Sequence, residues 1–87
     1  VCRMNTRECI RSCFYRCTGQ ILPEHFGISE IRTVQRKPDV KHVTAIVVWG
    51  AHEFRVCYDA YVNRDGDVIA CHPGCVDDGV YFRYDFI

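Results

Sequence analysis

Residues 54–62, which read Phe-Arg-Val-Cys-Tyr-Asp-Ala-Tyr-Val, have the periodicity of a β-strand and are the clearest fold signal in the chain. Phe54, Val56, Tyr58, Ala60 and Val62 fall on one face, and Arg55, Cys57, Asp59, Tyr61 and Asn63 fall on the other. A period of two with one apolar face is typical of a strand that buries one side. We therefore predict a half-buried strand here.

Downstream of this strand the sequence predicts a hairpin and a final strand. Residues 63–67 read Asn-Arg-Asp-Gly-Asp, and the Asp-Gly pair tolerates the positive φ of a tight turn. The apolar residues 68–70 follow, which completes the hairpin signature. We predict further turns at residues 72–74 and 77–79, which hold turn-forming residues, and a last strand over the alternating residues 80–86.

Upstream, two further segments are predicted as strands. Residues 43–49 form a nearly unbroken apolar run that Gly50 closes, which is typical of a central strand covered on both faces. The apolar residues between 26 and 34 are spaced ambiguously, nearer to a helical turn than to a strand. We predict a strand at residues 28–36.

The N-terminal segment carries the signals of a helix. Asn5 or Thr6 can cap its start, and Glu8 stands three residues after Asn5, as in a capping box. Gly19 provides a C-terminal stop. The spacing predicts a helix over residues 6–18.

Composition places these elements in one small α+β domain spanning residues 1–87. The chain has eleven valines and seven isoleucines but one leucine, a ratio that favours pleated surfaces over helix bundles. We expect an N-terminal helix packed on an antiparallel β-sheet of three to five strands. A domain of this size buries only about 60–65% of its unfolded surface, so we also expect disulfide stapling.

Seven cysteines in 87 residues indicate an oxidising compartment, and a chain that begins with Val1 reads as a mature secreted protein. Three cysteines, Cys9, Cys13 and Cys17, form one inward stripe of the predicted helix and lean the same way, so they are poorly placed to bond to one another. Each is predicted to bond to one of the three downstream cysteines, namely Cys57, Cys71 and Cys75. This partition is a preference among many arrangements.

Cys2 is then left over, and we predict that it forms an intermolecular disulfide, which would give a covalent homodimer or heterodimer. The competing use of the cysteines is a metal site, because Cys71-His72-x-x-Cys75 and the helical series hold soft ligands at short spacing. The paired spacing of a structural zinc motif is missing. We expect no metal and no cofactor.

Four histidines raise a catalytic alternative of the ribonuclease type, in which two imidazoles exchange protons across a phosphate. The sequence offers His42 with Lys41, or His52 with Glu53 and Arg55, but no specific spacing. We interpret the histidines as loop residues and expect no enzymatic activity.

Charge is divided between the two halves of the chain although its total is zero. Residues 1–41 hold eight basic and four acidic side chains, whereas residues 42–87 hold three and seven. The neutral total argues against nucleic-acid binding, and no apolar run is long enough for membrane insertion. We predict a partner-binding patch of Arg32, Arg36, Lys37 and Lys41, with outward aromatic anchors at Trp49, Tyr61 and Tyr81. The alternative is that these charges intersperse on a solvated surface.

One longer pattern matches a known family. It consists of Cys17, Pro23, Phe26, Ile28, Ile31, Val34 and Pro38, then Thr-Ala-Ile-Val-Val at residues 44–48 and Phe-Arg-Val-Cys-Tyr-Asp at residues 54–59. This pattern resembles the chemokine family from its N-terminal cysteine through its third strand, although the family's third cysteine has no counterpart here. The resemblance implies a bond from Cys17 to Cys57, an N-loop at residues 20–27 and a three-stranded antiparallel sheet.

The sequence thus favours a secreted, chemokine-like or cytokine-like ligand that binds a receptor or another host protein. Its basic patch would contact an acidic receptor segment or a sulfated polysaccharide. The alternatives are a secreted effector or toxin that blocks a host target, and a small ribonuclease-type hydrolase.

Overall fold

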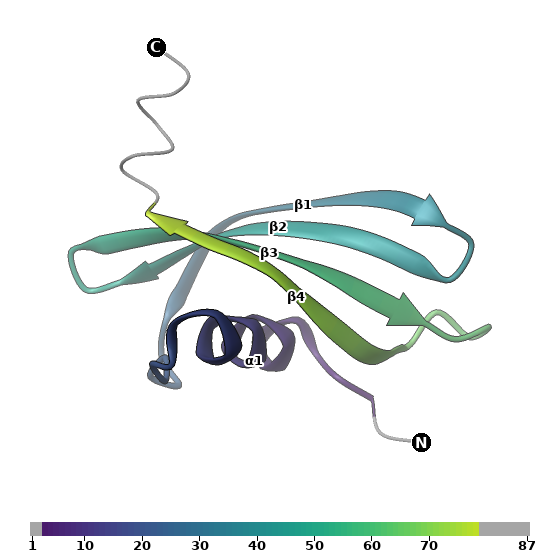
Figure 1. The fold of residues 1–87 in the computed structure, drawn as a ribbon, viewed down its shortest axis with the longest axis horizontal. Helices are drawn as coiled ribbons and strands as arrows, with labels where there is room; N and C mark the ends of the chain where they lie inside the picture. The colour runs from purple at the N-terminus through teal and green to yellow at the C-terminus, as the bar shows by residue number, and fades with distance from the viewer. Residues whose placement is uncertain (1–2, 79–87) are drawn as a thin grey trace, which may run out of the picture.

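The computed structural model describes residues 3–78, which form one helix and a four-stranded antiparallel sheet. The elements are α1 (Thr6–Thr18), β1 (Gly27–Lys37), β2 (Val40–Trp49), β3 (His52–Val62) and β4 (Val68–Asp78). The strands follow chain order β1-β2-β3-β4, and α1 lies across one face of the sheet (Figure 1). The predicted α+β architecture and the predicted number of strands are confirmed.

Local capping explains why α1 begins and ends where the sequence predicts. The backbone N–H of Glu8 donates to Asn5 Oδ1 at 2.8 Å, and the Glu8 carboxylate accepts from the Asn5 N–H, so the capping box is complete. Gly19 adopts φ of 76°, a left-handed conformation that glycine takes without a Cβ penalty, and its N–H donates to the Tyr15 carbonyl.

The strand predictions at residues 28–36 and 54–62 are confirmed by β1 and β3, and the hairpin after β3 is present, with Gly66 at φ of 85°. Two expectations are wrong. Residues 43–49 are covered on one face only, because Val43 is buried whereas Thr44 is half-buried on the side without a helix. The predicted turn at 72–74 and the first two residues of the predicted turn at 77–79 lie inside β4, because pairing with β3 overrides the local turn preference, and residue 79 lies outside the described residues.

Pro73 and Gly74 are accommodated because β4 is an edge strand. Pro73 lies opposite Tyr58, and on an edge strand its missing N–H need not break the ladder. The register then shifts by one residue, so that Gly74 forms a bulge before Cys75 pairs with Cys57. The predicted strand at residues 80–86, Tyr81 and Cys2 lie outside the described residues.

The core lies between α1 and the sheet. It contains Cys9, Ile10, Cys13, Phe14, Leu22, Phe26, Val43, Ala45, Val47, Val56, Tyr58 and Ala60. The ring of Phe14 packs edge-to-face on Trp49 and Phe54, with centroids 6.5 and 5.2 Å away. The helix packs mainly against β4 and β3 rather than against β1.

Two arginines of α1 hold the connection between α1 and β1 in place. The Arg7 guanidinium lies 4.0 Å from the ring centre of Phe26 and donates to the carbonyls of Glu24 and Phe26, each at 2.6 Å. Arg11 donates to the Leu22 carbonyl at 3.3 Å. These arginines therefore anchor a loop, a role that their spacing alone did not predict.

Candidate functional site

The sheet face that points away from α1, here called the open face, carries three rows of side chains across all four strands. The register gives these rows as Val34–His42–Asp59–His72, Arg32–Thr44–Cys57–Cys75 and Glu30–Ile46–Arg55–Asp77. No helix or strand of residues 3–78 covers this face (Figure 1). The side chains of these rows are half-buried or exposed, except that of Cys57, which is buried.

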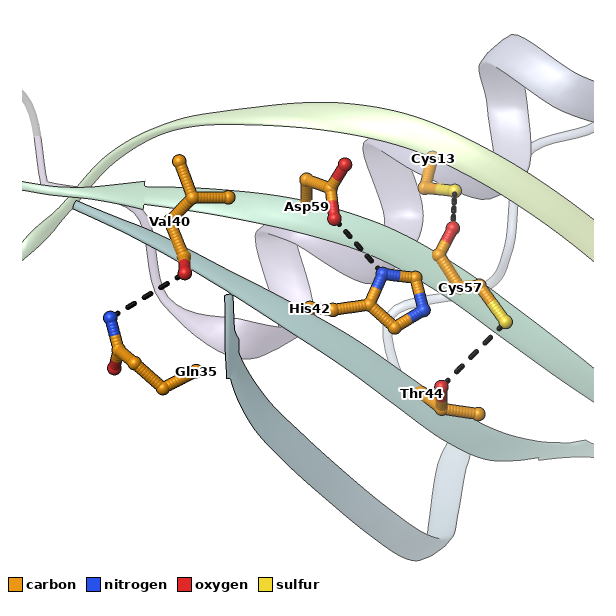
Figure 2. Close-up of polar contacts among 7 residues, drawn as sticks. All are labelled: Cys13, Gln35, Val40, His42, Thr44, Cys57 and Asp59. Carbon is orange, nitrogen blue, oxygen red and sulfur yellow. Dashed lines mark hydrogen bonds and ion pairs between the residues drawn. The ribbon is translucent and has the colours of Figure 1, made fainter. Parts of the chain in front are cut away.

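The first row is centred on a pair of polar side chains from β2 and β3. His42 Nδ1 lies 2.9 Å from Asp59 Oδ1, and the second ring nitrogen of His42 lies on the side of Cys57 (Figure 2). His72 is the register partner of Asp59 on β4. Asp59 is thus the register partner of a histidine on each side, His42 and His72. The spacing of these residues in the sequence did not predict this arrangement.

The second row contains two thiols. The Thr44 hydroxyl lies 3.8 Å from Cys57 Sγ (Figure 2), and Cys75 is the register partner of Cys57 on its other side. Burial raises the pKa of the Cys75 thiol to about 11, and the neighbouring Cys57 raises it further. The neighbouring Arg55 acts in the opposite direction, because its charge favours the thiolate.

The third row is charged and ends in an ion pair. Arg55 Nη2 donates to Asp77 Oδ2 across β3 and β4. On β1, Arg32 pairs with Glu30 at 2.7 Å along the same strand.

On the covered face, the thiols of the helix meet β4. Burial raises the pKa of the Cys9 thiol to about 12, and the neighbouring Cys71 adds to this shift. Burial also raises the pKa of Cys13 to about 12, and its thiol donates to the Cys57 carbonyl at 3.3 Å. Burial of Tyr58 beside these thiols raises the pKa of its phenol.

The six described cysteines are all free thiols in the structure. The inward stripe is confirmed for Cys9 and Cys13, which are buried, whereas Cys17 is exposed at the end of α1. Cys9 lies beside Cys71, as a helix-to-sheet bond requires, but Cys57 Sγ lies on the open face. The bonding of all three helical cysteines to the sheet stays a prediction.

The free edge of β1 is the second candidate surface. Every residue of β1 except Ile28 is exposed. Three of the four predicted basic residues lie on it, namely Arg32, Arg36 and Lys37. The fourth, Lys41, faces the helix side and lines a pocket of about 150 Å³ together with Ile31, Thr33 and Val43. The predicted patch is therefore divided between the two faces of the β1–β2 hairpin.

The predicted aromatic anchors differ in their exposure to solvent. Tyr61 is exposed on the open face, as predicted. Trp49 is half-buried and packs against Phe14 in the core, so only part of its surface is left for a partner. Ile31 and Val34 on β1 are exposed as well, which their apolar character did not predict.

Lys41 and His42, the first set of the ribonuclease alternative, are not brought together. Lys41 lies on the helix side of β2 and His42 on the open face, because neighbouring strand residues point to opposite sides. His52 is an exposed residue at the start of β3 whose ring stacks on Phe54. Within residues 3–78, no group of three or more His, Cys, Asp or Glu side chains is arranged to hold a metal ion.

None of the helices in the described part of the chain has the length and apolarity needed to span a membrane. Comparisons with protein-family models, with curated proteins and with solved structures gave no match.

Proposed function

We propose that this protein is a secreted binding module that holds an extended, acidic segment of another protein along the free edge of β1. The observation that carries the proposal is the exposure of β1, where all residues but Ile28 are exposed and one side of the strand has no neighbour among the strands of residues 3–78. An unpaired strand edge offers a row of backbone N–H and C=O groups that an extended segment can complete.

Two features favour β1 over the other sheet edge, β4. β1 has register shifts at residues 28/30 and 35/37, and residues 30–35 between them pair with β2 in unbroken register, which leaves a six-residue edge without a bulge. In contrast, β4 carries Pro73 and the Gly74 bulge. Proline has no N–H for a partner strand, and bulges twist an edge away from pairing.

The charge of β1 selects an acidic partner. The strand carries Arg32, Arg36 and Lys37 against a single acid, Glu30, which already pairs with Arg32. In the described part of the chain, neither Arg36 nor Lys37 has an acidic partner. These two charges therefore complement carboxylates placed beside the β1–β2 hairpin.

Apolar contacts on both faces of β1 would add to the backbone pairing. The side chain of Ile31 is 44% exposed on the helix side, and that of Val34 is 59% exposed on the open face. A partner strand places alternate side chains on both faces, so it would cover both residues.

A nuclear magnetic resonance titration tests this function. The isotope-labelled protein is titrated with a short peptide that alternates Glu and Val, and with a matched peptide that alternates Lys and Val. We expect amide shifts concentrated in residues 30–37 with the acidic peptide only. Shifts confined to β4, equal shifts with both peptides, or shifts at β1 only with a heparin oligosaccharide would overturn the proposal.

A signalling ligand and a blocking effector would both use this edge. Once a target is known, they are distinguished by whether the protein activates the target or inhibits it.

A further inference from the structure

Cys57 and Cys75 face each other directly across β3 and β4, and both side chains lie on the open face. Residues directly opposite each other in an antiparallel pair have Cα atoms about 4.5–5.5 Å apart. Disulfides span Cα separations of about 4.4–6.8 Å. The backbone therefore already holds these two residues at a bonding separation.

We propose that Cys57 and Cys75 form a cross-strand disulfide on the open face, and that this bond is the most readily reduced one in the protein. The proposal is independent of the function assigned to the β1 edge. The two residues are direct register partners, and Cys57 Sγ now lies 3.8 Å from the Thr44 hydroxyl on the side of β2. Bond formation then requires rotation of the Cys57 side chain away from Thr44 and toward Cys75.

The helix is in the wrong place to supply the partner of Cys57. Cys13 approaches this residue from the covered face and contacts its carbonyl oxygen, whereas Cys57 Sγ lies near the Thr44 hydroxyl on the other face (Figure 2). Cys9 contacts Cys71 instead. A bond between Cys57 and any helical cysteine would have to pass through the sheet.

Thiol–disulfide exchange with a small-molecule disulfide forms this bond with balanced chemistry. The exposed Cys75 loses a proton to solvent, and its thiolate attacks the small disulfide and releases one small thiolate. Cys57 then loses its proton, attacks the Cys75 sulfur and releases the second small thiolate. The protein loses two electrons and two protons, and the small disulfide becomes two thiols.

Exposure makes this bond the first to be reduced. Cys75 is exposed, so a reductant can reach its sulfur directly. A bond between Cys9 and Cys71 would instead lie between α1 and the sheet, where Cys9 is 1% exposed. Exposed disulfides are typically the labile ones.

Non-reducing tryptic digestion of the oxidised protein tests the pairing directly. Free thiols are first blocked at acidic pH. Cleavage after arginine and lysine places Cys9, Cys13, Cys17 and Cys57 in four separate peptides, 8–11, 12–16, 17–32 and 56–64. Cys71 and Cys75 stay together in peptide 65–83, and electron-transfer fragmentation assigns the bonded one.

We expect peptide 56–64 to be linked to peptide 65–83 through Cys75. Linkage of 56–64 to any of the three helical peptides, or a free Cys57, would overturn the proposal. In Cys75→Ser the newly free thiol should be Cys57, and a free helical thiol would contradict the pairing. The oxidised protein is also treated with increasing phosphine at acidic pH. The peptide that holds Cys57 should be the first to be released from its disulfide. Earlier release of a helical peptide would refute the proposed order of reduction.

Discussion

The backbone of Gly74 in β4 lies so close to Cys57 in β3 that a β-carbon at residue 74 would be 2.8 Å from the Cys57 carbonyl oxygen. The same oxygen accepts a hydrogen bond from Cys13 of α1. One carbonyl group thus joins the helix, a central strand and the bulge of the edge strand, and this contact depends on glycine at residue 74.

Gly74→Ala should therefore destabilise the fold by about 1–3 kcal/mol, because so short a contact with a backbone oxygen forces the backbone to move. Urea denaturation measures the change. Gly27→Ala is the matched control, since its new β-carbon would be 3.7 Å from Val48 Cβ, an ordinary contact. Equal stabilities for the two variants would contradict this description of the bulge.

Asn5→Ala removes the side chain that accepts from the Glu8 N–H, and it should cost about 0.5–2 kcal/mol of stability. Asn5→Ser retains a capping oxygen and should lose much less. The comparison is made by thermal denaturation. If both variants lose the same amount, the cap does not stabilise α1 in the way described.

Phe14→Ala removes a fully buried ring that contacts Trp49 and Phe54, and it should cost about 3–5 kcal/mol. Tyr15→Ala, at a neighbouring helical residue that is 54% exposed, should change stability by less than about 1 kcal/mol. Tryptophan fluorescence follows unfolding in both variants. The reverse order of the two losses would mean that α1 packs through another face.

Stability of the reduced protein should fall at alkaline pH. The pKa of Cys9 and that of Cys13 are raised from 9.0 to about 12 in the folded state, so the folded protein keeps protons that the unfolded chain has already released. Stability is then complete below pH 9.0 and is lost as the pH rises toward about 12.

Urea midpoints measured under strong reductant, from about pH 8 to about pH 11, check this dependence. Each thiol contributes a slope of up to about 1.4 kcal/mol per pH unit. The variant Cys9→Ala/Cys13→Ala should show a shallower slope than the natural sequence. A stability that rises over this range would be inconsistent with the burial of these thiols.

The regular parts of the fold were predictable because their signals are local. The capping box at Asn5 and the alternation in residues 54–62 each depend on neighbouring residues, and both predictions are confirmed. The turn predicted at residues 72–74 failed because Pro73 and Gly74 are turn formers locally, whereas pairing with β3 decides their conformation.

The candidate surfaces were harder to predict because they depend on register. His42 and Asp59 are 17 residues apart, and only the pairing of β2 with β3 brings them together. Lys41 and Arg32 lie on opposite faces of the sheet. Predicting this requires knowing the strand register, because the register decides the face to which each side chain points. The exposure of β1 depends on where the helix packs, a long-range property.

The most direct test of the central claim is the dissociation constant of the acidic Glu-Val peptide for Arg36→Glu/Lys37→Glu. The control is Arg16→Glu/Arg64→Glu, which makes the same change in charge at two exposed residues outside β1. If an acidic segment lies along β1, the first variant should bind about tenfold or more weakly, and the control should bind like the natural sequence. Unchanged affinity in the first variant, or equal weakening in both, would contradict binding at the β1 edge.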